Sequence, residues 1–199
     1  MDDIVKAAML KWPQVPHCYG WLALDARGNW RMRDAQCQAS ENAGDKIHNT
    51  ALVAFINRNY QSDEMGRYYF QNGPQKVYVD LACTPYICHY HQDVGWQLHT
   101  GVTLPTPSAA HLLDDGHIVF AFAHSLAQVD DRDLVYALTL IRQDKLSLSD
   151  DTILNLLDQG AASEPLPTLS VEMDGQHLPL YRSQLTDLIA QLGIQTLVR

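Results

Sequence analysis

Residues 66–91 read GRYYFQNGPQKVYVDLACTPYICHYH and hold the densest run of strand-forming side chains in the chain. Asn72-Gly73 separates the first two apolar runs of this segment. Because both residues tolerate positive φ, the pair is a strong signal for a β-hairpin. Thr84-Pro85 separates the second run from the third, since a proline cannot donate to a strand ladder. The segment therefore predicts a three-stranded β-meander at the centre of a sheet.

Helical and strand patterns alternate outside this segment. Leu52, Phe55 and Ile56 recur at helical spacing within residues 49–60, which predicts a helix whose apolar face packs on the sheet. Residues 118–123 form a nearly unbroken apolar run, typical of a strand that is buried on both faces. We therefore predict an α+β fold, with antiparallel meander sheets and helices packed on one side.

The sequence LPTPS at residues 104–108 is the first candidate for a boundary within the chain. It divides the chain into an N-terminal strand-helix-meander lobe, residues 1–104, and a C-terminal strand-helix lobe, residues 105–199. A hairpin followed by a helix occurs at residues 21–60 and again at residues 169–192, as expected for two lobes of similar design. The chain length of 199 residues suits either two small lobes or one compact domain.

The composition is that of a globular protein with an acidic surface. A hydrophobic content of 46% with 19% charged residues can supply a substantial core. The net charge of −9 argues against a nucleic-acid partner, because binding to phosphates needs clustered lysines and arginines. An acidic surface instead favours a small molecule or a basic patch on a partner protein.

Other features predict where the protein acts. No apolar run approaches the length of about 18 residues that a membrane span needs, so no membrane partner is expected. The N-terminal residues lack a basic region followed by an apolar block, so they do not read as a signal peptide. The four cysteines are scattered and are expected to be free thiols in a reducing compartment: Cys18, Cys37, Cys83 and Cys88. These features together predict a cytoplasmic location.

No catalytic signature is recognisable in the sequence. A Gly-x-Ser-x-Gly nucleophile turn, a Gly-x-Gly-x-x-Gly loop and a Walker-type loop do not occur. Asp114-Asp115 and Asp130-Asp131 are adjacent pairs, whose carboxylates point in different directions and typically form turns or helix caps. We therefore expect no cofactor, and a catalytic site would have to be assembled from residues far apart in the chain.

Cys88, His89 and His91 form the most suggestive cluster of chemically active residues. Residues two apart on a strand point to the same face, so His89 and His91 are candidates to present two imidazoles to one metal ion. His99 on the next strand is the natural third ligand, if the turn centres on residues 93–95. The alternative is that these side chains are half-exposed polar residues on the solvent face of an antiparallel sheet.

Turn glycines, a Gly-Pro pair and aromatic strand residues recur between residues 17 and 123: Gly20 to Leu24 with Asp25, Gly28 and Trp30, then Leu52 with Phe55, Gly66-Arg67-Tyr68, residues 73–77 and Thr84-Pro85-Tyr86. This pattern resembles that of uncharacterised proteobacterial proteins grouped as a family of unknown function. The resemblance implies an α+β protein built from a repeated strand-and-helix motif, with a suggested role in signalling. The family supplies no catalytic residues to carry over.

These observations favour a non-catalytic cytoplasmic module for binding or regulation, with signal transduction as the role that the resemblance suggests. Its partner is expected to be a small molecule or another protein. The alternative is a small hydrolase or transferase, metal-dependent or metal-free, whose site comes from residues that are distant in sequence.

Overall fold

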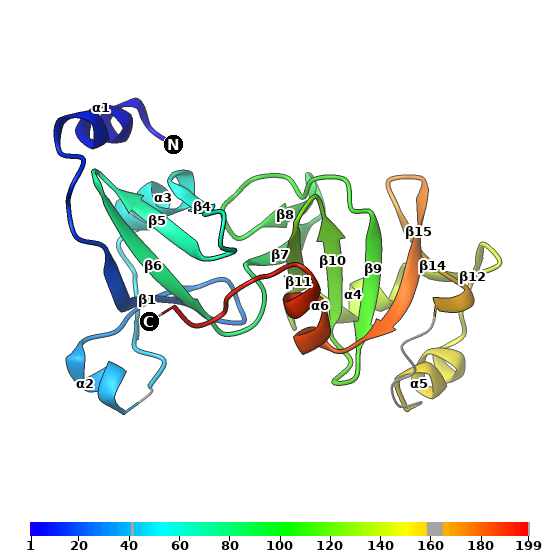
Figure 1. The fold of residues 1–199 in the computed structure, drawn as a ribbon. Helices are drawn as coiled ribbons and strands as arrows, with labels where there is room; N and C mark the ends of the chain where they lie inside the picture. The colour runs from blue at the N-terminus through cyan, green and yellow to red at the C-terminus, as the bar shows by residue number, and fades with distance from the viewer. Residues whose placement is uncertain (41, 159–164, 199) are drawn as a thin grey trace. The chain divides into compact units, whose positions relative to one another are not determined.

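The computed structural model describes residues 1–40, 42–158 and 165–198 (Figure 1). This part of the chain contains six helices and fifteen strands, and the strands form two β-sheets. The combination of helices with two sheets confirms the predicted α+β class. None of the described helices has both the length and the apolar character needed to cross a membrane.

The described residues form two compact units. The first unit combines residues 1–85 with residues 99–102 and the segment that starts at Gly193. The second unit combines residues 86–98 with the described residues between 103 and 192. The predicted division into two lobes that are consecutive in sequence, residues 1–104 and residues 105–199, stays a prediction.

The first unit is built on a six-stranded sheet with the strand order β3-β2-β1-β6-β5-β4. The predicted turn at Asn72-Gly73 is present, because β5 and β6 pair as an antiparallel hairpin on either side of it. The elements of this unit, in chain order, are α1 (Asp3–Lys11), β1 (Cys18–Leu24), β2 (Trp30–Met32), α2 (Ala35–Ala39), β3 (Asp45–Lys46), α3 (Thr50–Arg58), β4 (Tyr60–Ser62), β5 (Tyr68–Asn72) and β6 (Gln75–Leu81).

The second unit is built on a nine-stranded sheet with the strand order β13-β12-β14-β15-β9-β10-β11-β7-β8. The apolar run at residues 118–123 supplies β10 near the middle of this sheet, where Ile118, Val119 and Phe120 are fully buried. The elements of this unit are β7 (Tyr86–His91), β8 (Gly95–Leu98), β9 (Ala109–Leu113), β10 (Ile118–Phe122), β11 (Ser125–Val129), α4 (Leu134–Thr139), β12 (Ile141–Gln143), β13 (Leu146–Ser147), α5 (Asp150–Asp158), β14 (Pro165–Met173), β15 (Gln176–Ser183) and α6 (Leu185–Gln191).

Both sheets are mixed, so the predicted purely antiparallel arrangement is wrong. Parallel pairs join β1 to β6, β11 to β7 and β15 to β9. The predicted three-stranded meander is also wrong, because β5 and β6 belong to the sheet of the first unit and β7 belongs to the sheet of the second. Parallel partners are not joined by a tight turn, so no local signal in the sequence reveals them.

Helix α3 packs on β5 as predicted. Asn49 caps the helix, because its Oδ1 accepts a hydrogen bond from the Leu52 N–H (3.0 Å). Ile56 is 2% exposed and is the buried anchor of the helix. Phe55 is half-buried, and its ring meets Phe70 of β5 edge to face, with the ring centroids 5.3 Å apart. The main anchor is therefore Ile56, with Phe55 in a supporting position.

Candidate functional site

A parallel strand pair in the second unit brings two distant segments of the chain together. β11 pairs with β7 so that Val129 lies opposite Cys88. The N–H of Asp130 continues this ladder by donating to the carbonyl of Cys88 (3.0 Å). Asp130, the first residue after β11, therefore lies beside His89 on β7, and its side chain is fully buried.

Asp133 joins this pair from the turn that follows β11. Its N–H donates to the Asp130 carbonyl (3.0 Å). Asp133 occupies the N-cap position of α4, yet in the described chain its side chain makes no cap hydrogen bond. Its Oδ2 instead accepts a hydrogen bond from the backbone N–H of Tyr90 on β7 (3.2 Å). An N-cap aspartate ordinarily satisfies the amides of its own helix, whereas this carboxylate is turned toward β7.

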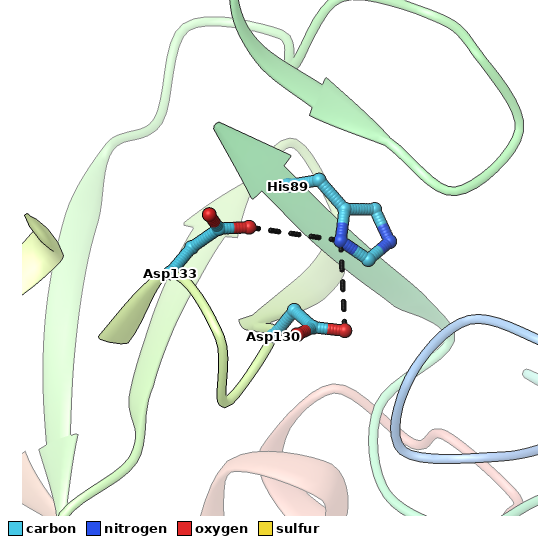
Figure 2. A group of neighbouring side chains, drawn as sticks. All are labelled: His89, Asp130 and Asp133. Atoms are coloured by element: carbon cyan, nitrogen blue, oxygen red, sulfur yellow. Dashed lines mark ion pairs between the residues drawn. The ribbon is translucent and has the colours of Figure 1, made fainter. Parts of the chain in front are cut away.

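Figure 2 shows Asp130 and Asp133 converging on one ring nitrogen of His89. His89 Nδ1 lies 3.5 Å from Asp130 Oδ2 and 3.7 Å from Asp133 Oδ2. One donor atom from each of the three side chains lies within 4.8 Å of the other two. The side chains of His89 and Asp133 are 21% and 24% exposed, so solvent reaches the group beside the buried Asp130.

Arg132 clamps the carboxylate of Asp130. Its Nε donates to Oδ1 (2.7 Å), its Nη2 donates to Oδ2 (2.8 Å) and its backbone N–H donates to Oδ1 (2.9 Å). Burial raises the pKa of Asp130, but the hydrogen bonds from Arg132 outweigh that effect and lower the pKa to about 2. The carboxylate is therefore charged at neutral pH. Oδ1 accepts two of these hydrogen bonds and Oδ2 accepts one, so Oδ2 keeps a second lone pair for a further partner.

The imidazole of His89 is kept neutral. Burial lowers the pKa of His89, and the attraction of Asp130 and Asp133 opposes this effect only in part, because Arg132 and His91 repel the protonated ring. A neutral imidazole is the form that binds metal ions. The group thus offers one neutral nitrogen donor and two carboxylates.

The three histidines that the sequence singled out have different surroundings in the structure. His89 belongs to the group with the two aspartates, and His91 is exposed at the end of β7. The residue opposite His89 in β8 is Gln97, so the register that would place His99 there is wrong. His99 belongs to the first unit, where its ring packs edge to face on Trp30 with a centroid separation of 5.2 Å. Metal binding by these histidines stays a prediction.

Sequence reasoning missed Asp130 and Asp133. The sequence pattern indicates a turn or a helix cap at Asp130-Asp131 and gives no role to Asp133. The available signal was the run DDRD at residues 130–133, which directly follows a buried strand. A carboxylate at the end of a fully buried strand cannot reach bulk water easily and needs a partner. His89 on β7 lies beside this carboxylate because β7 pairs in parallel with β11. The sequence does not reveal that pairing.

The donor geometry fits a divalent metal ion. Zinc binds imidazole nitrogen and carboxylate oxygen at about 2.0–2.2 Å, so neighbouring donors of a tetrahedral site lie about 3.4 Å apart. The two distances from His89, 3.5 and 3.7 Å, are close to this value. The donor atoms of Asp130 and Asp133 lie within 4.8 Å of each other. The hydrogen bonds from Arg132 to Asp130 are of the kind that orient ligating carboxylates.

Comparison with known proteins identifies a solved structure with a similar fold and a family to which the chain belongs. A solved structure of a DUF1285 family protein from Silicibacter pomeroyi DSS-3 is 13% identical, covers 84% of each chain and superimposes with a TM-score of 0.50. At this identity the likeness concerns the fold alone. No curated protein matches the chain. The family DUF2944, described as "Protein of unknown function (DUF2946)", matches residues 1–197, and the chain therefore belongs to this family of unknown function.

Proposed function

We propose that the protein is a non-catalytic regulatory module that binds a divalent transition-metal ion through His89, Asp130 and Asp133. One observation carries this proposal: the two carboxylates converge on a single nitrogen of a neutral imidazole at distances of 3.5 and 3.7 Å. Because the residues come from β7, from the end of β11 and from the cap of α4, an ion at this point joins three segments of the second unit.

The donor set selects the kind of ion. One imidazole with two carboxylates suits zinc, manganese, iron and cobalt, whereas calcium and magnesium prefer sites made entirely of oxygen. The two carboxylates and Arg132 together carry one negative charge, so the site attracts a cation even with the arginine in place. Zinc should bind more tightly than manganese, following the general affinity order of divalent metals.

A regulatory role in the cytoplasm is part of the proposal. All four cysteines are free thiols, which fits a reducing compartment. The net charge of −9 favours a basic protein surface or a small molecule over nucleic acid as the further partner. A bound ion ties the turn before α4 to β7. Its binding and release therefore provide a local change that a signalling partner can detect.

The test of this proposal is metal binding by purified protein after treatment with a chelator. Equilibrium dialysis against zinc, followed by elemental analysis, should give one ion per chain. Asp133→Asn should weaken binding at least about tenfold, by analogy with losses seen at ligand-orienting positions. Asparagine keeps an oxygen that can accept the Tyr90 N–H, so this change spares the fold. Calcium and magnesium at the same concentration should not compete.

Matched control variants separate the group from general surface binding. His124→Ala and Asp93→Asn change an exposed histidine and an exposed aspartate elsewhere on the second unit, and both should leave zinc binding unchanged. His91→Ala distinguishes the group with the two aspartates from a site made by the two histidines of β7. Zinc bound equally well by the wild type and by Asp133→Asn would contradict the proposal, as would stoichiometric binding that only His91→Ala abolishes.

A second candidate function, a small hydrolase, is favoured by one observation in the second unit. Ser183 Oγ lies 2.8 Å from His111 Nδ1, beside a pocket of about 220 Å³ that both residues line. Burial lowers the pKa of His111 to about 4, so its imidazole is neutral at pH 7 and can accept a hydrogen bond from the hydroxyl. A fluorophosphonate probe should label Ser183 if this pair is an active nucleophile. A wild-type protein that stays unlabelled, like Ser183→Ala, would reject the hydrolase.

A further inference from the structure

The first unit contains a pocket that plays no part in the metal-binding proposal. It has a volume of about 290 Å³ and lies over the ends of β1 and β6 beside the C-terminal segment. Apolar side chains make up much of its wall, among them Leu24, Leu81 and Leu197. Pockets for drug-sized ligands have volumes of about 300–1,000 Å³, so this one suits a smaller molecule.

Two arginine–aspartate pairs supply the charged part of the wall. Arg33 is 8% exposed and pairs with Asp80, with its Nη1 2.6 Å from Asp80 Oδ2. The side chain of Arg31 is 29% exposed and pairs with Asp25, with its Nε 2.8 Å from Asp25 Oδ2. Both pairs line the pocket. The charges of the wall therefore sum to zero, and the hydrogen bonds decide which ligand it can bind.

Both carboxylates of this wall already accept hydrogen bonds from the protein. Asp25 accepts five hydrogen bonds, from the backbone N–H groups of Arg27 and Asn29, from the Asn29 side chain twice and from Arg31. A carboxylate has about four lone-pair sites, so Asp25 is saturated. Asp80 uses one oxygen for Arg33 and the other for the N–H of Val198 (3.2 Å).

The donors are not committed to the same extent. A guanidinium carries five N–H donors. Arg31 donates from Nε to Asp25 and from Nη1 to the Gly44 carbonyl (3.3 Å). Arg33 donates from Nε to the Asn42 carbonyl (3.0 Å) and from Nη1 to Asp80. Among the described residues, neither Nη2 group has a protein acceptor, so the wall offers hydrogen-bond donors to a ligand that brings acceptors.

We propose that this pocket binds a small monocarboxylate, whose carboxylate is held by Arg31 and Arg33 and whose apolar body lies against Leu24, Leu81 and Leu197. Arginine is the side chain that matches the planar geometry of a carboxylate. An apolar wall with a few convergent polar groups is the usual construction of a small-molecule site. A neutral amide of the same shape brings one acceptor fewer and no charge, so the pocket should discriminate between the two.

The experiment compares acids with their amides by isothermal titration calorimetry. The probes are hexanoate with hexanamide and benzoate with benzamide, in buffer that contains EDTA, so that the metal-binding group of the second unit does not affect the result. The acids should bind at least tenfold more tightly than the amides. Arg31→Gln should weaken binding of the acids at least tenfold, whereas Arg27→Gln, which changes an exposed arginine outside the pocket, should leave it unchanged.

A second variant guards against misfolding of Arg31→Gln. Ala82 is exposed and lines the pocket, so Ala82→Leu should block the acids by filling space while keeping both arginines. Thermal unfolding of each variant without ligand checks the fold. Three results would each overturn the proposal. They are equal affinity for acid and amide, binding that survives Ala82→Leu, and no binding of either acid at a concentration of about 10 mM.

Discussion

At the scale of single residues, the account rests on Asp133 and on the clamp that Arg132 places on Asp130. The carboxylate of Asp133 is not used by its own helix, and Asp130 is fully buried next to a neutral imidazole. An unpartnered buried carboxylate is costly, so Arg132 supplies the compensation. The same hydrogen bonds fix the orientation of the oxygen that faces His89.

We expect Arg132→Gln to weaken zinc binding without removing it. Loss of the clamp frees the Asp130 carboxylate to rotate, and comparable changes beside metal ligands cost about 10–100-fold in affinity. The pKa of Asp130 should rise from about 2, since its largest lowering partner is gone. Zinc titration of the variant, with NMR titration of the carboxylate, checks both effects. A tighter zinc complex would show that Arg132 competes with the ion.

His111 gives the stability of the protein a pH dependence of known sign. Burial lowers its pKa to about 4 in the folded chain. In the unfolded chain the histidine has its usual pKa of about 6.5. Between these pH values the unfolded state binds more protons, so stability falls as the pH falls through this window. The loss should reach about 1–3 kcal/mol by the lower end.

Urea denaturation at several pH values between neutrality and the acid limit measures this loss. In His111→Asn the part of the pH dependence that belongs to the imidazole should disappear, while asparagine can still pair with Ser183. An unchanged pH profile in the variant would show that His111 does not contribute.

At the scale of the elements, the structure shows which local signals in the sequence were sufficient. The Asn72-Gly73 turn, the Asn49 cap of α3 and the apolar run of β10 each encode their structure within a few residues, and all three are present. The parallel pairs are different, because β7 and β11 are far apart in sequence and no turn joins them. Those pairs, and therefore the group around His89, could not be predicted from local patterns.

In helix α3, Ile56 and Phe55 both lie on the apolar face that the helical spacing predicts, but Ile56 is more deeply buried. Ile56→Ala should destabilise the protein by about 2–5 kcal/mol, the range for a large aliphatic side chain in a core. Phe55→Ala should cost less, because the Phe55 ring is half-buried. The exposed change Ala54→Ser is the control and should stay within about 0.5 kcal/mol. Urea midpoints for the three variants decide the order, and a larger loss for Phe55→Ala would contradict it.

At the scale of the whole molecule, the first unit combines residues 1–85 with the segment that starts at Gly193, far away in sequence. The segment that starts at Gly193 returns to it and makes two backbone hydrogen bonds, from the Gln195 N–H to the Gly66 carbonyl (3.0 Å) and from the Leu81 N–H to the Thr196 carbonyl (2.7 Å). Val198 is buried beside them. Closure by residues so far apart in sequence is another feature that local patterns do not encode.

Gly66→Ala should disrupt this closure. Gly66 has φ of +71°, and a Cβ there would collide with the carbonyl oxygen of Gly193. Gly101 is the matched control, because its φ is +84° and nothing lies within 4 Å of a built Cβ. Gly101→Ala should cost about 1–2 kcal/mol from backbone strain alone. Gly66→Ala should cost clearly more in urea denaturation, and equal losses would contradict the close approach.

The group of His89, Asp130 and Asp133 is the central claim, and anomalous diffraction tests it most directly. Crystals of the protein grown with zinc, measured on both sides of the zinc absorption edge, locate every bound ion. The account predicts one peak within about 2.0–2.2 Å of His89 Nδ1, Asp130 Oδ2 and Asp133 Oδ2. A map with no peak at these three atoms, or with zinc bound instead at His91 or His99, would contradict it.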